Sequence, residues 1–497
     1  MASPVNRLAS RLLALCLGPF ACSLLAFGAL ASEPAAPGVA PAPSAPASPR
    51  RPDIILISFD TLRRDHVSCY GAERLTTPRI DALAASGVRF TDAQGVVPLT
   101  GPSHVTILTG LNPQEHGAFR NGVKVNPATI TLPQLLATQG YETAAVVSGW
   151  TLKRSQVGLD ACFKFYDDEG MEERYGVVNL MRRADKVTDA ALAWADRQVA
   201  KTLPGTSRAP SFLFVHYFDP HEPYESPLTE APGPNPAAGG FQRPLHVEAL
   251  PAYDREIAFA DRELGRLLDG FKTRGMLDDT VILVTADHGQ SFGDHGYGGP
   301  EGAHGRRVYQ DNVAVPFILF APGRIPGGRS VDLPVSHLDI LPTLATLGGV
   351  PESVMPPGLP GFSLAKVLAD PASPPPWGKA RRTRHGVTYR GAVGNKWNIF
   401  RWAMNKDVDA AEPLYAFGIQ DGKKLIVDFT PRHSIEVYDL VKDPWERHPL
   451  AVEDVPGRDA WAQAVLDWYA RTKSSDLRAS QPTGAELENL RSLGYVE

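Results

Sequence analysis

The sequence predicts an α/β fold, in which a large and mostly parallel β-sheet lies between helices and a small antiparallel α+β subdomain follows it. Near-continuous apolar runs of strand length recur at residues 53–59, 211–218 and 280–286. Such runs are typical of strands that are buried on both faces. Segments with helical periodicity separate the runs, and this alternation builds a sheet with helices on both sides. After about Pro374 the pattern changes to short runs that are typical of hairpins.

Capping signals locate the first helix of this pattern. Thr77 and Pro78 are residue types preferred at the N-cap and first turn of a helix, and Gly87 is typical of a helix end. A helix is therefore expected between Pro78 and Gly87. Further helices are expected at residues 132–138, 187–200, 253–271 and 459–472, and further strands at residues 141–147, 396–402, 423–429 and 434–440.

The first 31 residues have the features of a signal peptide. Arg7 and Arg11 precede an uncharged apolar run, and Ala29 and Ala31 form a small-x-small cleavage site. The sequence therefore predicts an exported protein, periplasmic or secreted, with no membrane span after cleavage. Residues 12–31 are also long enough to cross a bilayer, so an uncleaved membrane anchor is the alternative.

Composition divides the rest of the chain into three parts. Residues 32–51 are rich in Pro, Ala and Ser and lack an apolar periodicity, as expected of a linker. A catalytic domain is expected at residues 52–373, and the antiparallel subdomain with its helix at residues 374–497. The content of 43% hydrophobic and 21% charged residues is that of a globular protein.

Charge and cysteine content exclude some classes of partner and scaffold. Cleavage after Ala31 would remove two arginines and change the formal net charge from −5 to −7, which argues against nucleic acid as a partner. Only Cys69 and Cys162 would remain. The mature chain can therefore carry one disulfide or two free thiols, but no disulfide scaffold.

Acidic residues directly follow two of the predicted buried strands. Asp60 follows residues 53–59, and Asp287 with His288 follows residues 280–286. A single Asp at a strand end is commonly a turn or cap residue. In open α/β sheets, however, ligands bind beyond the carboxyl ends of the strands, where distant parts of the chain converge. We therefore expect Asp60, Asp287 and His288 to hold one divalent cation. The histidine favours zinc or manganese, whereas calcium or magnesium prefers an all-oxygen site.

Thr100 is the candidate nucleophile. Pro102 and the apolar residues up to Leu108 predict a helix that begins near Thr100. The threonine hydroxyl would then lie at a helix N-terminus, where backbone N–H groups and the helix dipole favour an anionic substrate. The alternative is that Thr100 is only an N-cap.

Motifs along most of the chain resemble those of the sulfatase family of the alkaline phosphatase superfamily. Sulfatases carry Cys or Ser, any residue, Pro, Ser and Arg, then a Thr-Gly pair; this chain has Thr100, Gly101, Pro102, Ser103 and His104, then Thr109 and Gly110. Other similar segments, in family order, are FDTLRRDHVSCYG (59–71), TTPRIDALAASGVRF (76–90), FDPHEPY (218–224), TADHG (285–289), SHLDILPTLATLGGVP (336–351) and EVYDLVKDPWERHPLA (436–451). The resemblance implies a large mixed sheet between helices, a small C-terminal antiparallel sheet, and hydrolysis of sulfuric esters at a metal site.

The departures from the family pattern concern the nucleophile and the positively charged side chains that bind sulfate. Sulfatases convert their Cys or Ser to formylglycine, and Thr100 cannot form this aldehyde, so no formylglycine is expected. His104 stands in place of the motif's Arg, and residues 148–150 (Ser-Gly-Trp) in place of a Lys-Trp-His segment. We therefore expect Thr100 to be both a metal ligand and a nucleophile that the metal activates.

The resemblance also places further residues around the transferred group. His104, His221 and His304 are expected to be catalytic residues that orient this group or assist the leaving oxygen. Asn121 matches an Asn that holds the transferred group in phosphoryl-transfer relatives with a Thr nucleophile; a turn residue is the alternative. A second metal bound by Asp219, His221 and His304 is also considered. The spacing of His288 and His304 resembles that of cofactor-independent phosphoglycerate mutases, which bind a second metal. One metal is favoured, because those enzymes do not use an Asp and a His two positions apart.

The predicted function is exported, metal-dependent hydrolysis of an anionic ester, either a sulfuric or a phosphate ester, with Thr100 as the nucleophile. The expected substrate is a small anionic ester or a sulfated or phosphorylated glycan or lipid. Two alternatives remain. One is an enzyme similar to phosphodiesterases and phosphonate monoester hydrolases, and the other is a catalytically silent sulfatase fold that binds an anionic ligand.

Overall fold

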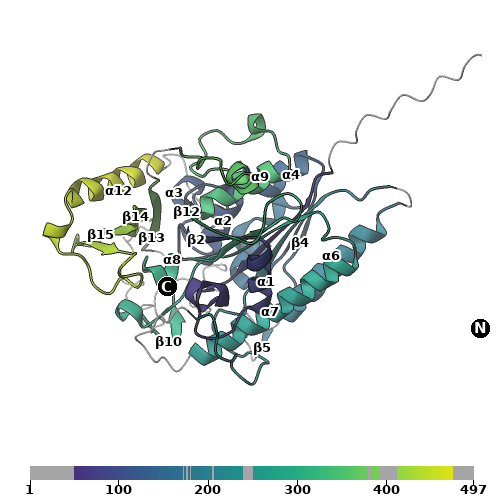
Figure 1. Cartoon of the computed structure of the whole chain (residues 1–497), viewed down its shortest axis with the longest axis horizontal. Helices are drawn as coiled ribbons and strands as arrows, with labels where there is room; N and C mark the ends of the chain where they lie inside the picture. Colours follow the sequence, from purple (N-terminus) through teal and green to yellow (C-terminus); the bar gives the residue numbers. More distant parts are fainter. Residues whose placement is uncertain are drawn as a thin grey trace, which may run out of the picture. The chain divides into compact units, whose positions relative to one another are not determined.

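Figure 1 shows the fold in a computed structural model of the chain. The structure describes residues 50–473 except 172, 175–176, 179–180, 204–205, 239–249, 379–381 and 391–410. The described residues from Arg51 onward belong to one compact unit. The predicted signal peptide, nearly all of the predicted linker and the predicted strand at 396–402 lie outside the described residues.

The centre of the fold is an eight-stranded sheet with the strand order β12-β2-β11-β8-β1-β7-β3-β4. Its strands are β1 (Asp53–Phe59), β2 (Val88–Gln94), β3 (Glu142–Val146), β4 (Phe165–Asp167), β7 (Ser211–Tyr217), β8 (Thr280–Ala286), β11 (Phe317–Phe320) and β12 (Arg329–Ser336). β11 runs antiparallel to both of its neighbours, and the other pairings in this sheet are parallel. The apolar runs predicted as strands form β1, β7 and β8, in which every residue is buried. The predicted mixed, mostly parallel sheet is thus confirmed.

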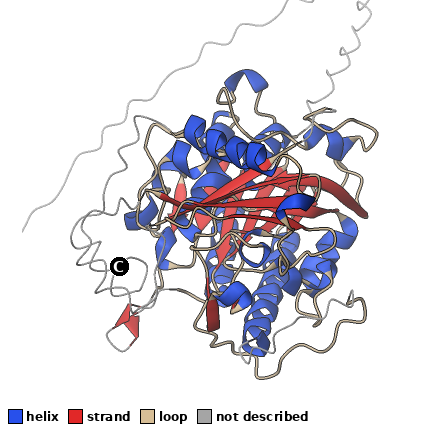
Figure 2. Ribbon diagram, turned by 90° about the vertical axis from the view of Figure 1, so that its left-hand side faces the viewer, coloured by secondary structure: helices blue, strands red, loops and turns tan. Residues whose placement is uncertain are grey.

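Helices cover both faces of this sheet (Figure 1; Figure 2). One face carries α1 (Pro78–Ser86), α6 (Ala184–Ala200) and α7 (Leu250–Thr273), and the other carries α2 (Thr100–Thr109), α4 (Leu132–Thr138) and α9 (Ile340–Leu347). α1 begins and ends where its capping signals predict. At Gly87 a Cβ would lie 2.5 Å from the carbonyl oxygen of Leu319, so glycine is needed for the chain to approach β11 this closely.

A second, four-stranded antiparallel sheet follows in the C-terminal part. Its strands are β13 (Arg384–Tyr389), β14 (Pro413–Gln420), β15 (Lys423–Asp428) and β16 (Ile435–Asp439), and α12 (Arg458–Thr472) packs on β14 and β15. The strands predicted at 423–429 and 434–440 and the helix predicted at 459–472 are confirmed. The domain boundary at residue 374 remains a prediction.

A buried ion pair in the C-terminal part makes hydrogen bonds to the segment after His304. Lys424 Nζ lies 2.8 Å from Glu446 Oε1, and both side chains are 0% exposed. Lys424 also donates a hydrogen bond to the Val308 carbonyl oxygen, and Glu446 Oε2 accepts one from the Gln310 N–H at 2.5 Å. The small sheet therefore holds the backbone at residues 308–310 in place.

The structure bears on two further expectations, the state of the cysteines and the presence of a membrane-spanning helix. Cys69 and Cys162 carry free thiols, which is one of the two predicted alternatives. Within the described part of the chain, no helix combines the length and the apolar character that crossing a bilayer requires.

Candidate active site

Two acidic residues meet at the carboxyl edge of the central sheet. Phe59 at the end of β1 pairs with Ala286 at the end of β8, so the residues that follow, Asp60 and Asp287, lie side by side. Both are completely buried. The Asp287 N–H donates a hydrogen bond to the Phe59 carbonyl oxygen at 3.2 Å, which fixes the two strand ends at the same level. The predicted convergence of these strand ends is confirmed.

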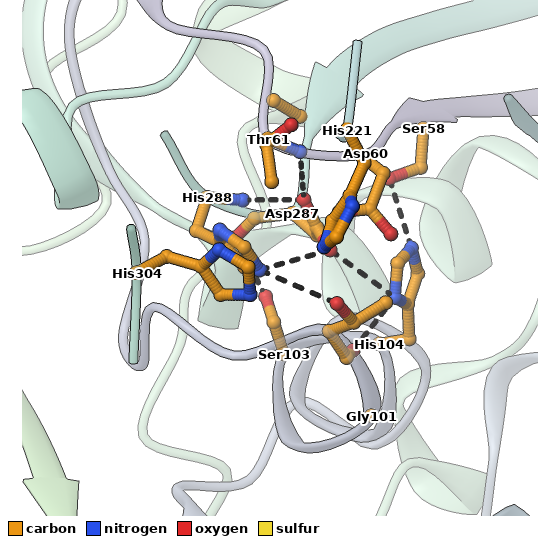
Figure 3. A network of polar contacts seen from close by, with 12 residues as sticks. Ser58, Asp60, Thr61, Gly101, Ser103, His104, His221, Asp287, His288 and His304 are labelled. Atoms are coloured by element: carbon orange, nitrogen blue, oxygen red, sulfur yellow. Dashed lines mark hydrogen bonds and ion pairs between the residues drawn. The ribbon is translucent and has the colours of Figure 1, made fainter. Parts of the chain in front are cut away.

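Asp60, Asp287 and His288 form a group of potential metal ligands, with one ligand atom of each within 4.8 Å of the others (Figure 3). Asp287 Oδ1 accepts hydrogen bonds from the backbone N–H groups of Thr61, at 3.0 Å, and His288, at 2.7 Å. The Nδ1–H of His288 donates to the Gly289 carbonyl oxygen at 2.9 Å, so Nε2 carries the lone pair. That nitrogen lies 3.4 Å from Asp287 Oδ2, and both atoms are available as ligands.

The chemistry of this group fits a divalent cation. Neither oxygen of Asp60 nor Oδ2 of Asp287 has a hydrogen-bond donor within the described residues, although buried carboxylates normally have one. Burial and the neighbouring Asp60 raise the pKa of Asp287. For Asp60, burial acts in the same direction, but the nearby imidazoles of His216, His221 and His288 outweigh it and hold the pKa below its usual value. A cation allows two adjacent buried carboxylates to be ionised together, and the oxygen and nitrogen donors suit zinc or manganese.

The start of α2 places Thr100 against this group. Thr100 is the first residue of the helix, after Leu99 in an extended conformation, and every residue of α2 is buried. Thr100 Oγ1 lies 3.4 Å from His288 Nε2. The predicted position of the hydroxyl at a helix N-terminus, where an anion is favoured, is confirmed.

Asn121 contacts the first turn of α2. Its Oδ1 accepts a hydrogen bond from the Gly101 N–H at 2.8 Å. A Cβ at position 101 would lie 2.9 Å from that oxygen, so glycine makes the contact feasible. The amide nitrogen of Asn121 is buried and has no acceptor among the described residues. Its N–H groups are therefore available next to Thr100, a placement that suits the predicted role in holding the transferred group.

His104 has protein partners on both ring nitrogens. Nδ1 lies 2.7 Å from the Thr100 carbonyl oxygen, and Nε2 lies 2.9 Å from Ser58 Oγ. Burial and the nearby His216 lower the pKa of His104 well below its usual value, so the ring is neutral. This geometry does not favour the expected direct contact with substrate. His104 instead connects the first turn of α2 to the end of β1, as a positioning residue.

His221 and His304 lie beside the metal-ligand group, where they were expected. The ring centroid of His304 is 4.7 Å from that of His288 and 5.1 Å from that of His221. Figure 3 shows the three imidazoles gathered around Asp287. Asp219 does not join them, because its Oδ1 accepts a hydrogen bond from the Ala184 N–H at the start of α6, at 3.0 Å. The groups of potential metal ligands found among the described residues do not include Asp219, so the structure does not bring together the second-metal group considered from the sequence.

Comparison with known proteins decides the family. The sulfatase family model matches residues 52–350, which is more than half of the chain. The chain belongs to the sulfatase family. Human arylsulfatase A is 27% identical to this sulfatase over 453 residues, which cover 81% of the chain and 83% of the human protein.

Solved structures share the fold of this sulfatase. The protein BT4656, in complex with its substrate D-glucosamine-2-N,6-O-disulfate, matches with a TM-score of 0.64 and 21% identity, over 86% of this chain and 99% of that one. The phosphonate monoester hydrolase of Agrobacterium radiobacter matches with a TM-score of 0.62 and 21% identity, over 85% and 96%. The predicted fold class and the predicted enzyme class, a hydrolase of sulfuric esters, are confirmed.

Sequence reasoning did not assign a role to two buried polar residues around the site of this sulfatase. His216 Nε2 lies 3.4 Å from Asp60 Oδ2, and Ser103 Oγ donates a hydrogen bond to the Asp287 carbonyl oxygen at 2.8 Å. His216 was detectable, because a histidine is unusual within the apolar run of β7. Ser103 was visible only as the Ser of the family motif, and its contact with Asp287 could not be predicted because it joins distant segments of the chain.

Proposed function

We propose that this sulfatase uses unmodified Thr100 as the nucleophile in a metal-dependent hydrolysis of sulfuric esters. The observation that carries the proposal is the 3.4 Å contact between Thr100 Oγ1 and His288 Nε2, inside the group that Asp60 and Asp287 complete. Asp60, Thr100, Asp287 and His288 would hold a divalent cation, which would lower the pKa of the hydroxyl and polarise the ester oxygens. Zinc or manganese suits this mixed donor set.

The reaction has two steps. Thr100 Oγ1 attacks the sulfur, the bond between sulfur and the alcohol oxygen breaks, and the alcohol leaves with a proton. Water then hydrolyses the sulfated threonine, which releases sulfate and restores the hydroxyl. A threonine ester cannot expel sulfate by forming an aldehyde, so the second step needs water. His221 and His304 line the site where they can orient the transferred group or assist the leaving oxygen.

Neutral donors take a large share in binding the anion. The N-terminus of α2 and the amide N–H groups of Asn121 lie next to Thr100, and such donors stabilise charge on the transferred oxygens. His104 supports them indirectly, because it fixes the Thr100 carbonyl. These N–H donors take over part of the anion binding that the Arg and Lys of the family motifs would provide.

The proposed substrate is a sulfated glycan, or another small or lipid-linked anionic ester. The structural neighbour BT4656 has a disulfated glucosamine as its substrate, and the shared fold supports a related class here. The features of residues 1–31 support export to the periplasm or the medium. Sulfated polymers would be accessible to the enzyme there.

A phosphate or phosphonate ester is the second candidate substrate. Thr100 together with Asn121 favours it, because this pair resembles the phosphoryl-transfer relatives. The fold shared with a phosphonate monoester hydrolase is compatible with it. A catalytically silent binding protein is the remaining alternative, and the arrangement of a nucleophile beside a metal-ligand group argues against it.

A panel of substrates and Thr100 variants tests the proposal. An aryl sulfate, a phosphate monoester, a phosphate diester and a phosphonate ester are compared with zinc, manganese, calcium or magnesium added. Thr100→Ser should keep measurable turnover, whereas Thr100→Ala and Thr100→Val should lose several orders of magnitude. Thr109→Ala, at the other end of α2, is the matched control, and peptide mass spectrometry should find Thr100 unmodified.

The panel also separates the alternatives. Undiminished turnover of every ester by Thr100→Ala would refute the nucleophile. Absence of turnover by the wild type on the whole panel, with metal bound, would favour the silent binding protein.

A further inference from the structure

A second group of potential metal ligands adjoins the first. One ligand atom each of His221, Glu222 and His304 lies within 4.8 Å of the others. Two imidazoles and one glutamate are a donor set of catalytic zinc sites, which keep a further position open for water or substrate. The His304 ring stacks on that of His288, with centroids 4.7 Å apart. The two groups therefore lie side by side.

Both imidazoles of this group are oriented for metal binding. His221 Nδ1 lies 2.7 Å from the Glu222 backbone carbonyl oxygen, which can only accept, so Nδ1 is the donor and Nε2 is the nitrogen that can bind a metal. The His221 ring also stacks on Phe218, with centroids 4.4 Å apart. His304 Nδ1 lies 2.9 Å from Gln290 Oε1, so in His304, too, Nε2 is the nitrogen that can bind a metal. Histidines whose other ring nitrogen donates to a protein oxygen in this way are typical metal ligands.

Gln290 orients two of the three ligands at once. Its Nε2 donates a hydrogen bond to Glu222 Oε2 at 3.0 Å, so its Oε1 is the atom that faces His304. Gln290 is completely buried, and Gly302 provides the space for it: a Cβ at position 302 would lie 2.0 Å from Gln290 Nε2. Hydrogen bonds that fix the orientation of several ligands typically surround metal sites.

We propose that His221, Glu222 and His304 bind a second divalent cation, zinc in the first place, next to the cation of the Asp60 group. Glu222 is the carboxylate ligand of this site, in the place that the sequence suggested for Asp219. Two adjacent cations would place positive charge next to a bound anionic ester. They supply the positive charge that sulfatases otherwise obtain from an Arg and a Lys, so His221 and His304 would act on the ester through the cation they hold.

Metal stoichiometry tests this proposal on the full chain. The wild type, stripped with a chelator and dialysed against zinc, should retain two equivalents. Glu222→Gln and His304→Gln should each retain one, and this remaining equivalent also shows that the variants are folded. Glu230→Gln, an exposed acid of the same loop, and His448→Gln, an exposed histidine, are matched controls that should retain two.

Manganese provides an independent measurement. Two manganese ions at the distance of about 3.5–4 Å that two-metal sites have are magnetically coupled. The wild type with two equivalents should give the electron paramagnetic resonance spectrum of a coupled pair, and Glu222→Gln that of an isolated ion. One equivalent in the wild type, or two in both variants, would overturn the proposal.

The second site extends the proposed function but does not depend on Thr100 as the nucleophile. Metal content and the resonance spectrum are measured without turnover. A failure of the Thr100 mechanism would therefore leave both results unchanged, and the two proposals can fail separately.

Discussion

Replacement of Lys424 by methionine tests how much the buried ion pair between Lys424 and Glu446 contributes to stability. Lys424 and Glu446 are both completely shielded from solvent, and their charged atoms are 2.8 Å apart. Lys424→Met keeps the length of the side chain but removes the ammonium. Among the described residues, Glu446 then keeps only the Gln310 N–H as a hydrogen-bond donor, at 2.5 Å, so an ionised carboxylate would be buried without the ammonium that balances it.

The expected loss of stability follows from the protonation of Glu446. Burial already raises the pKa of Glu446, and Lys424 opposes this shift. Without the lysine the folded state keeps the carboxyl neutral, whereas the unfolded chain ionises it above a pH of about 4.5. Each pH unit above that value costs about 1.4 kcal/mol, so the loss is roughly 3 kcal/mol at pH 7 and roughly 1 kcal/mol at pH 5.5. The penalty therefore shrinks as the pH falls.

Denaturant and thermal unfolding at the two pH values measure this loss. The double variant Lys424→Met with Glu446→Gln should recover most of the stability, because no charge remains to be buried. Lys442→Met is the matched control: this lysine is 86% exposed and 4.0 Å from Asp439, and its loss should cost less than about 1 kcal/mol. An equal loss at pH 7 and pH 5.5 would refute the reasoning, since it would mean that Glu446 stays ionised.

Substitutions at three other positions should separate metal binding, catalysis and stability. Asp287→Ala should lose bound metal and activity together while the fold persists, because a strand-end ligand contributes to the site more than to the core; equal metal content in variant and wild type would contradict this. Asn121→Ala should lower kcat about 100-fold with little change in metal content, as expected for one donor to the transferred oxygens, and steady-state kinetics with metal analysis check it. Burial lowers the pKa of His116 to about 3, so the wild type should lose about 3 kcal/mol between pH 7 and pH 4 as the unfolded chain takes up this proton. His116→Gln should not show that loss, and thermal unfolding of the variant and the wild type at pH 7 and pH 4 measures the difference.

The elements that carry the site were predictable because their signals are local. β1, β7 and β8 appear as apolar runs, since each is buried on both faces. The start of α2 follows from Pro102 and the apolar residues after it. The four-residue strand β11 has no such signal, and its antiparallel direction depends on the strands between which it lies.

The parts of the site that could be predicted are those in which the direction of the strands alone brings residues together. Asp60 and Asp287 meet because parallel strands end at the same edge. The direction of a side chain in a loop is not encoded in this way. Asp219 precedes His221 by two positions, yet its carboxylate turns to the start of α6, and Glu222 joins the histidines instead. His104 lies one helical turn after Thr100 on the same face of α2, where only the packed structure reveals that Ser58 is its partner.

The burial of α2 has a consequence for covalent maturation. A modifying enzyme can reach residue 100 only while α2 is outside the folded structure, and releasing an element of the core requires extensive unfolding. In a Thr100→Cys variant with His104→Arg, which restores the family motif, conversion to formylglycine would therefore have to take place on the chain as it is synthesised or translocated. The competition between folding and modification, rather than the motif alone, would set the yield.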